Sequence, residues 1–404
     1  VHPRCHFPPL QAARSDLGRH AEALSIMKER ADNVPGNIYH NRKAQWAAYL
    51  ALFAALALLP LIAGDSFVLN QLARYAALAM LAVSVSFVWG YGGILSLGQG
   101  IAFGIAAYGM AMTMQMQSQD PVSAPIPSFM LTNGIETLPW LWAPFWSTPV
   151  GLILTLAVPT LFFIGFGAMM FQARVAGVFV AIMTLAMLAA LYSMAYDMQP
   201  YTAGFNGITP PAPFVFMGIT FDPYGTTAYY LCIAILAFVT LSAKALLQSK
   251  FGTIVQAIRD DAERVRFLGY NVAYYQVVVF AISGLIAAFG GLCWVLIVQY
   301  VSPTSFEITL SISAVIWAAV GGRMSLFGAI VGAFLINGMQ SYLGDELQQI
   351  WLIILGAAFI GVVLFLPNGI AGVIERVLEG VKPNRETSSD RQLASIGDSV
   401  KESV

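Results

Sequence analysis

The residues best suited to chemistry gather in one polar stretch of an otherwise apolar chain. Residues 250–271 read KFGTIVQAIRDDAERVRFLGYN, and this stretch carries a run of ionic side chains: Arg259, Asp260, Asp261, Glu263, Arg264 and Arg266. A Lys, Arg or Asp at the centre of a bilayer costs about 2.5–3.5 kcal/mol, so the stretch must lie in water. Mixed charges of this kind suit docking to a protein partner by ion pairs. They are equally typical of a solvated loop between two spans.

The apolar residues of the same stretch predict an amphipathic helix. They recur at spacings of three and four: Phe251, Ile254, Val255, Ile258, Ala262, Val265 and Leu268. Gly269 follows the last of them and suits a helix C-terminus. We therefore expect a short helix, presented to the cytoplasm between two membrane spans.

Several other chemistries are excluded by residue type. All four histidines lie before residue 41, so the apolar part offers no histidine-based metal site, catalytic triad or proton relay. No GxxxxGK[ST] phosphate-binding loop occurs. Cys232 and Cys293 sit in apolar runs and are expected as buried free thiols. We therefore expect no catalytic residue, no metal site and no cofactor held by this chain, and a net charge of −1 gives no case for nucleic acid.

The composition is that of a membrane protein. Of the 404 residues, 58% are hydrophobic and only 10% are charged, whereas soluble domains average about 25% charged residues. The mean hydropathy is +0.72. The predicted fold class is all-α, a polytopic integral membrane protein with about ten transmembrane helices.

The predicted spans place both termini in the cytoplasm. They cover residues 46–63, 67–90, 94–116, 149–171, 175–196, 226–247, 274–298, 306–319, 326–343 and 350–366. With ten spans, all but Arg74 of the 20 Lys and Arg residues fall on the cytoplasmic side, which is the positive-inside bias. The third and eighth segments could be broken or re-entrant, which leaves a count of nine to eleven open.

Three regions are expected along the chain. Residues 1–43 form a cytoplasmic N-terminal extension of unassigned role. Residues 44–376 form the transmembrane domain, with the helix-bearing loop at 248–272. Residues 377–404 are polar and Ser-rich, and we expect a disordered tail.

A path for a neutral solute is the second candidate site. The titratable residues Arg74, Asp197 and Glu307 all fall near predicted span edges, so a path driven by energy from elsewhere is favoured over an ion-coupled carrier. Non-helical backbone at membrane depth either lines a cavity or is buried in protein. The residues that fit are Gly92, Gly93, Ser96, Gly98, Gln99, Gly321, Gly322 and Ser325. Helix packing and turns are the other use of these glycines, and interhelical hydrogen bonding is the other use of Gln99.

Several motifs carry a family resemblance. Glu263 and Gly269 have the spacing of the Glu-Ala-Ala-x-x-x-Gly motif of ABC-importer permeases, with Arg264 and Val265 in place of the two alanines. Four further segments are WGYGGILSLGQG (89–100), RVRFLGYNV (264–272), VIWAAVGGRMSLFGAIVGA (315–333) and LFLPNGI (364–370). Over residues 46–374 the chain resembles the LivM-type permeases of branched-chain amino acid importers. Within them it looks most like the C-type permease subunit of the urea importers.

The resemblance implies a transport subunit of the bacterial cytoplasmic (inner) membrane. It implies a second, different permease subunit, two cytoplasmic ATPase subunits that hold ATP and Mg, a periplasmic or extracellular solute-binding protein, and surrounding lipid. The motif implies a coupling helix that docks on an ATPase, through Arg259, Asp260, Asp261, Glu263, Arg264 and Gly269.

Three functions stay open at this point. The first is an ABC-importer permease for urea or a short amide. The second is the same kind of permease for branched-chain amino acids, whose carboxylate and ammonium groups would want charged partners or helix ends at depth. The third is an ATP-independent channel or carrier for a small neutral solute, which leaves the helix at 250–271 unexplained.

Overall fold

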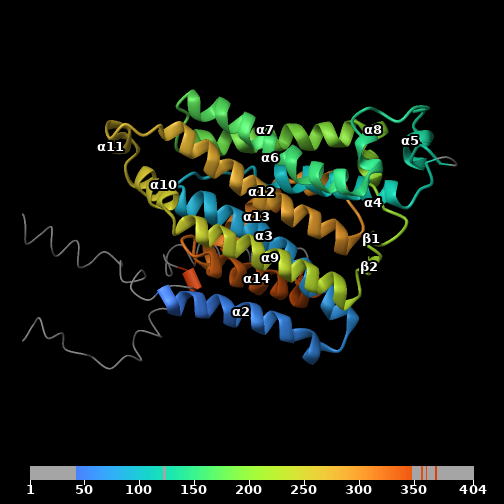
Figure 1. Cartoon of the computed structure of the whole chain (residues 1–404), viewed down its shortest axis with the longest axis horizontal. Helices are drawn as coiled ribbons and strands as arrows, with labels where there is room; N and C mark the ends of the chain where they lie inside the picture. The colour runs from blue at the N-terminus through green and yellow to red at the C-terminus, as the bar shows by residue number, and fades with distance from the viewer. Residues whose placement is uncertain (1–41, 122–123, 348–355, 358–360, 362–368, 371–404) are drawn as a thin grey trace, which may run out of the picture. The chain divides into compact units, whose positions relative to one another are not determined.

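The computed structural model describes residues 42–121, 124–347, 356–357, 361 and 369–370 (Figure 1). Most of the predicted last span at 350–366, the tail at 377–404 and all but the end of the N-terminal extension lie outside the described residues. The chain forms two compact units, Val1–Leu56 and Ala57–Val404. Helix α2 (Arg42–Ala63) runs from the first unit into the second, and every element discussed below belongs to the second.

The second unit is helical, as predicted from the composition. Its long helices are α3 (Ser66–Val85), α4 (Gln99–Gln117), α6 (Thr148–Gln172), α7 (Val178–Asp197), α9 (Thr226–Leu247), α12 (Val272–Val298), α13 (Ile308–Gly321) and α14 (Leu326–Leu347). The shorter elements are η2 (Ser86–Tyr91), α5 (Ser128–Thr132), η3 (Ala143–Trp146), α8 (Gln199–Thr202), η4 (Gly204–Asn206), α10 (Lys250–Asp260), α11 (Ala262–Phe267) and η5 (Pro303–Phe306). Strands β1 (Phe214–Phe216) and β2 (Ile219–Phe221) form an antiparallel hairpin in the loop before α9.

Five described helices are long and apolar enough to cross a membrane. They are Ser66–Tyr91, which joins α3 to the π-helix η2, together with α6, α7, α9 and α12. Helices α13 and α14 pass the same test as a pair but are bent by 116° at the break between them. At about 21 Å, the 14-residue α13 is shorter than the roughly 30 Å hydrocarbon core. The full number of spans and the sides of the termini remain predictions.

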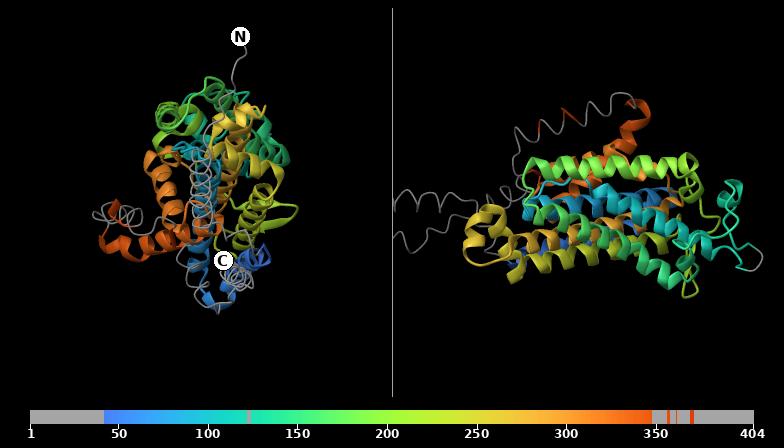
Figure 2. Two further views of the ribbon diagram at one scale, coloured as in Figure 1. Left: turned by 90° about the vertical axis from the view of Figure 1, so that its left-hand side faces the viewer. Right: turned by 90° about the horizontal axis from the view of Figure 1, so that it is seen from above.

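Helices α4 and α12 form the centre of this unit. Helix α12 packs against α3, α4, α6 and α9, and α4 packs against α6 and α12; the two views of Figure 2 show these helices running alongside one another. The most apolar stretch of α12 is 72% buried, whereas the corresponding stretch of α7 is 28% buried. Helix α7 therefore presents most of its apolar surface outward, as a lipid-facing helix does.

Glycines set the distance between the central helices. A Cβ atom on Gly291 of α12 would lie 2.0 Å from the Phe103 carbonyl oxygen of α4, and one on Gly104 would lie 2.5 Å from the Phe306 ring. Membrane helices gain no hydrophobic stabilisation from contact with each other rather than with lipid, so close backbone approach and van der Waals packing hold them together. Gly291 is therefore a position where any side chain forces α4 and α12 apart.

We expect Gly291→Ala to lower the thermal midpoint of the purified protein in detergent, because a new methyl group in a packed core typically costs about 1–3 kcal/mol. Gly165→Ala is the matched control. It lies in α6 with no atom within 4 Å of its added Cβ, and Ala favours a helix interior over Gly by about 1 kcal/mol. Equal midpoints for the two variants would contradict this account of the α4–α12 contact.

Candidate functional site

The polar stretch forms two helices, α10 and α11, rather than the one continuous helix predicted. The helices separate at Asp261, whose backbone is extended (φ −157°, ψ 94°). Its carboxylate accepts a hydrogen bond from the Arg264 amide at 3.1 Å, which caps the N-terminus of α11. An Asp at an N-cap satisfies an amide that would otherwise lack a partner, so the local sequence itself favours a new helix start here.

The buried face of this segment differs from the predicted one at its end. Ile258, Val265 and Val272 form a small apolar cluster, packed by Ile254, Ala262 and Tyr275. Leu268, expected on this face, is 76% exposed, and its neighbour Phe267 is 89% exposed. The break at Asp261 ends the helical register, so the spacing from α10 no longer predicts which side chains of α11 turn inward.

Gly269 ends α11, as the sequence predicted. Its φ is +89°, a left-handed backbone that suits glycine. The Gly269 amide donates to the Arg266 carbonyl at 3.0 Å, and the Tyr270 amide donates to the Val265 carbonyl at 3.4 Å. This pair of bonds is the Schellman arrangement, which satisfies carbonyls at a helix end.

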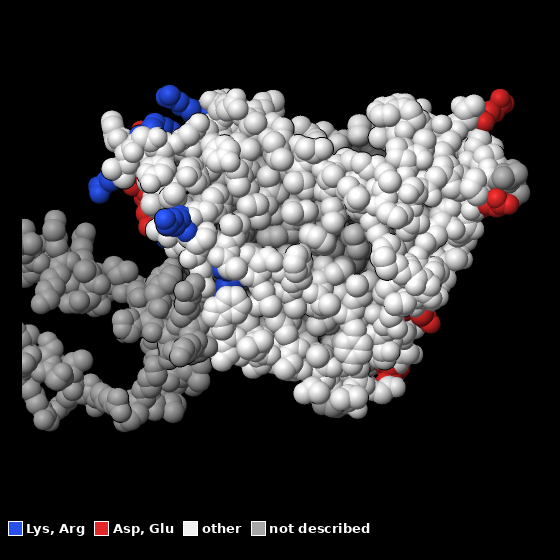
Figure 3. Space-filling model, viewed as in Figure 1, with Lys and Arg blue, Asp and Glu red and all other residues white. Residues whose placement is uncertain are grey.

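The ionic residues of the segment pair with one another. Arg264 bonds Asp261 at 2.7 Å, and Arg266 bonds Glu263. The side chain of Arg264 is 86% exposed and that of Glu263 is 69% exposed. Exposed pairs of this kind are worth about 0.2–1 kcal/mol, so a partner protein can exchange them for its own contacts. In Figure 3 the Lys and Arg residues of the visible face gather at the end that carries α10 and α11, which we call the basic end.

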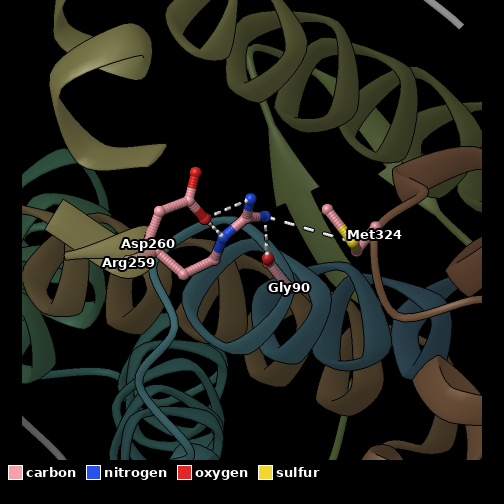
Figure 4. A network of polar contacts seen from close by, with 4 residues as sticks. All are labelled: Gly90, Arg259, Asp260 and Met324. Atoms are coloured by element: carbon pink, nitrogen blue, oxygen red, sulfur yellow. Dashed lines mark hydrogen bonds and ion pairs between the residues drawn. The ribbon is translucent and has the colours of Figure 1, made fainter. Parts of the chain in front are cut away.

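Arg259 makes contacts of another kind. Its Nη1 donates to the Gly90 carbonyl at 3.0 Å and lies 4.0 Å from the Met324 sulfur, while Nε and Nη2 donate to Asp260 at 3.0 and 2.8 Å. Figure 4 shows the guanidinium between these groups. One predicted docking residue thus reaches both segments that were predicted to line a solute path. Sequence reasoning missed Gly90 and Met324 as its partners.

The first of these segments is the break between η2 and α4. Helix α4 begins at Gln99, so residues 92–98 are not helical, whereas the predicted span began at Ile94. Hydroxyl groups accept hydrogen bonds from the amides at this break: Leu97 donates to Thr184 at 3.1 Å, Gly98 to Ser96 at 3.2 Å, and Gly100 to Ser311 at 3.0 Å. Thr184 and Ser311, from α7 and α13, were also missed by sequence reasoning.

Gln99 has an interhelical role in this structure. It is fully buried, accepts a hydrogen bond from Ser84 of α3 at 2.8 Å and donates to Ser283 of α12 at 3.2 Å. Gly92, Ser96 and Gly98 are buried as well, while Gly93 is exposed. The hydrogen bonds of Gln99 tie the start of α4 to both neighbouring helices.

The second segment is the hinge between α13 and α14. A Cβ on Gly321 would lie 1.9 Å from the Gly328 carbonyl oxygen, and Gly322 has a φ of +119°. The Ser325 hydroxyl accepts a hydrogen bond from the Gly328 amide at 3.1 Å, which caps α14. All three predicted residues therefore shape the tight turn between the two helices.

These features give two helix breaks side by side at the basic end. The crevice between residues 92–94, α10 and α12 is lined by apolar side chains such as Val255, Ile258 and Val279 and leaves no room for a water molecule. Within the described part of the chain, no cluster of three or more His, Cys, Asp or Glu residues has the arrangement of a metal site. The site is thus a tightly packed, glycine-rich junction between two helix breaks.

Comparison with known proteins identifies a family. The family described as "Branched-chain amino acid transport system / permease component" matches residues 67–365. The high-affinity branched-chain amino acid transport system permease protein LivM of Escherichia coli is 24% identical over 315 residues, which cover 72% of this chain and 67% of LivM. The ribose import permease protein RbsC of Haemophilus influenzae is 23% identical over 319 residues, 73% of this chain and 84% of RbsC.

A shorter match is to the fructose import permease protein FrcC of Rhizobium meliloti, 32% identical over 142 residues, which cover 32% of this chain and 37% of FrcC. No solved structure matches the chain. The family match covers most of the described helices, including both helix breaks and the polar segment between α9 and α12. The chain therefore belongs to the permease components of branched-chain amino acid transport systems, multi-pass inner-membrane subunits of ABC-type importers.

Proposed function

We propose that this chain forms the translocation path of an ABC importer for urea or a short amide, driven by ATP hydrolysis on separate subunits. The observation that carries the substrate class is the lack of depth-placed carboxylates in the part of the membrane domain that the structure describes. In the described spans, acidic side chains occur only at or near helix ends, such as Asp197 at the end of α7. A neutral solute with amide groups needs hydroxyls and backbone groups rather than charges.

The α10–α11 segment supports docking of an ATPase. It lies at the basic end and exposes the ionic side chains of Glu263 and Arg264 beside the apolar side chains of Phe267 and Leu268. An apolar anchor ringed by charges is the usual make-up of a protein interface centre and rim. We propose Arg259, Asp260, Asp261, Glu263, Arg264 and Gly269 as the ATPase-coupling residues.

The complex that this function requires has several subunits. It comprises a second, different permease, two cytoplasmic ATPases that hold ATP and Mg, and a solute-binding protein on the opposite side of the membrane. ATP binding draws the ATPases together and moves α10 and α11, and the helix breaks at residues 92–98 and 321–325 then rearrange to release solute inward.

Transport of a branched-chain amino acid is the second candidate, favoured by the LivM relatives, which are branched-chain amino acid transport system permeases. Such a solute carries a carboxylate and an ammonium group, for which charged partners or helix ends would be needed at depth. An ATP-independent channel or carrier gives the exposed α10–α11 segment no role.

Uptake of labelled urea and labelled leucine should separate these functions. Cells carrying the complete set of transport subunits are compared with cells whose ATPase subunit cannot hydrolyse ATP. We expect urea uptake that requires the active ATPase and that excess leucine does not reduce. ATPase-dependent leucine uptake would instead assign the amino acid function, and urea entry that persists with the inactive ATPase would assign the channel.

Gly269→Val and Glu263→Arg should each abolish uptake while leaving the protein in the membrane. Valine at Gly269 must adopt a left-handed backbone, at a cost of about 1–2 kcal/mol, so it displaces the end of α11. Glu263→Arg replaces an ion pair with two like charges. Gly177→Val is the matched control, because Gly177 also has a positive φ, +62°, and open space around it, but lies between α6 and α7. Uptake at the wild-type rate in both test variants would refute the coupling role.

A further inference from the structure

The arginines of the polar segment fall into two kinds. Arg264 and Arg266 pair with carboxylates of their own segment, with side chains 86% and 40% exposed. Arg259 is 23% exposed, and it is the one of the three for which a hydrogen bond to another helix is described. A docking role, which is the role proposed for the whole set, does not account for a guanidinium directed into the protein.

The acceptor of the Arg259 hydrogen bond is a carbonyl at a helix end. Gly90 lies in the last turn of the π-helix η2, just before the break at residues 92–98. Backbone carbonyls at a helix end lack intrahelical partners and take side-chain donors instead. Short π-helical segments are frequently found at functional sites. Arg259 thus caps the point at which the span Ser66–Tyr91 stops being a helix.

The same point touches the α13–α14 hinge through the backbone. A Cβ on Gly90 would lie 1.8 Å from the Arg323 carbonyl oxygen and 3.3 Å from the Met324 Cα. The Ser86 hydroxyl donates to that Arg323 carbonyl at 2.9 Å. The end of η2 and the hinge are therefore in direct contact, and Arg259 spans their meeting point by reaching Gly90 and Met324.

Glycine also makes room for Arg259 itself. A Cβ on Gly93 would lie 2.5 Å from the Arg259 Cγ, so the arginine stem crosses directly over the loop. Asp260 holds the other edge of the guanidinium by two hydrogen bonds to a single oxygen. The arginine is oriented by its own helix and bonded to a different one, and any shift of α10 must change that bond.

We propose that Arg259 is a positioning residue that latches the end of η2 to the α13–α14 hinge, and that movement of α10 releases this latch to open the basic end of the path. That an ATPase subunit moves α10 rests on the function proposed above. The latch itself is a property of this chain alone.

The latch can be tested on the full-length chain in lipid nanodiscs, where both membrane faces are open to a reagent. Ser86→Cys introduces a thiol at a fully buried position within the junction, in a background where the three native cysteines are replaced by alanine. The measured quantity is the rate of modification by a maleimide. We expect Arg259→Gln to raise this rate by about tenfold or more, the factor that corresponds to loss of one hydrogen bond to a charged group.

Lys250→Gln is the control for loss of positive charge, since Lys250 is exposed at the start of the same helix; its labelling rate should stay at the wild-type value. An unchanged rate in Arg259→Gln, or an equal rise in Lys250→Gln, would overturn the latch. If Arg259→Gln does not reach the membrane, Asp260→Asn carries the test, because it keeps the arginine but removes the carboxylate that orients it. A smaller rise is then expected, and no rise overturns the proposal.

A second measurement separates the latch from the proposed function. In the complete complex, Arg259→Gln should lower the amount of solute moved per ATP hydrolysed, whereas a purely structural defect would lower uptake and hydrolysis in proportion to the amount of folded protein and leave their ratio unchanged. Equal losses of hydrolysis and uptake would overturn the positioning role. Absence of ATP-driven uptake in the wild-type complex would overturn the proposed function instead, and the labelling result would still decide the latch.

Discussion

Backbone amides and carbonyls inside a bilayer have no water to bond, so a span can break only where other parts of the chain replace the lost hydrogen bonds. This constraint governs the arrangement at the basic end. Thr184 and Ser311 accept hydrogen bonds from the backbone amides of Leu97 and Gly100. Ser325 caps α14, and Arg259 donates a hydrogen bond to the Gly90 carbonyl. Helices α7, α13 and α10 are therefore needed to hold breaks that belong to other helices.

The hydropathy of the sequence is enough to predict most of the helices. Spans at residues 149–171, 226–247 and 274–298 are observed nearly as predicted, because an apolar run of about 20 residues has few other stable forms in a membrane. Hydropathy does not reveal where a span is interrupted. Residues 94–98 are as compatible with a helix as with the observed loop, and the loop is stabilised by the hydroxyl of Ser96 together with those of Thr184 and Ser311 from distant helices.

The candidate site was predictable in part. Gly269 carried a clear signal for a helix end. Asp261 carried a signal for a helix start, because Asp is a favoured N-cap residue and its side chain accepts a hydrogen bond from the amide three residues later. The apolar spacing through Leu268 nevertheless favoured one longer helix. The contact of Arg259 with Gly90 joins residues 169 positions apart. A single sequence contains no information on such a pairing, because its geometry depends on how α3, α12 and the hinge pack together.

Helix α4 has a consequence for how the protein is made. It is almost wholly buried, yet it is absent from the described helices that meet the hydropathy requirement for a span. Its packing partners α6, α12 and the element η5 all follow it in the chain. During synthesis α4 thus emerges before the surfaces that enclose it, with weak affinity for lipid of its own. Lipid alone therefore stabilises α4 less than it stabilises the candidate spans, and contacts with α6 and α12, which are synthesised later, supply much of its burial.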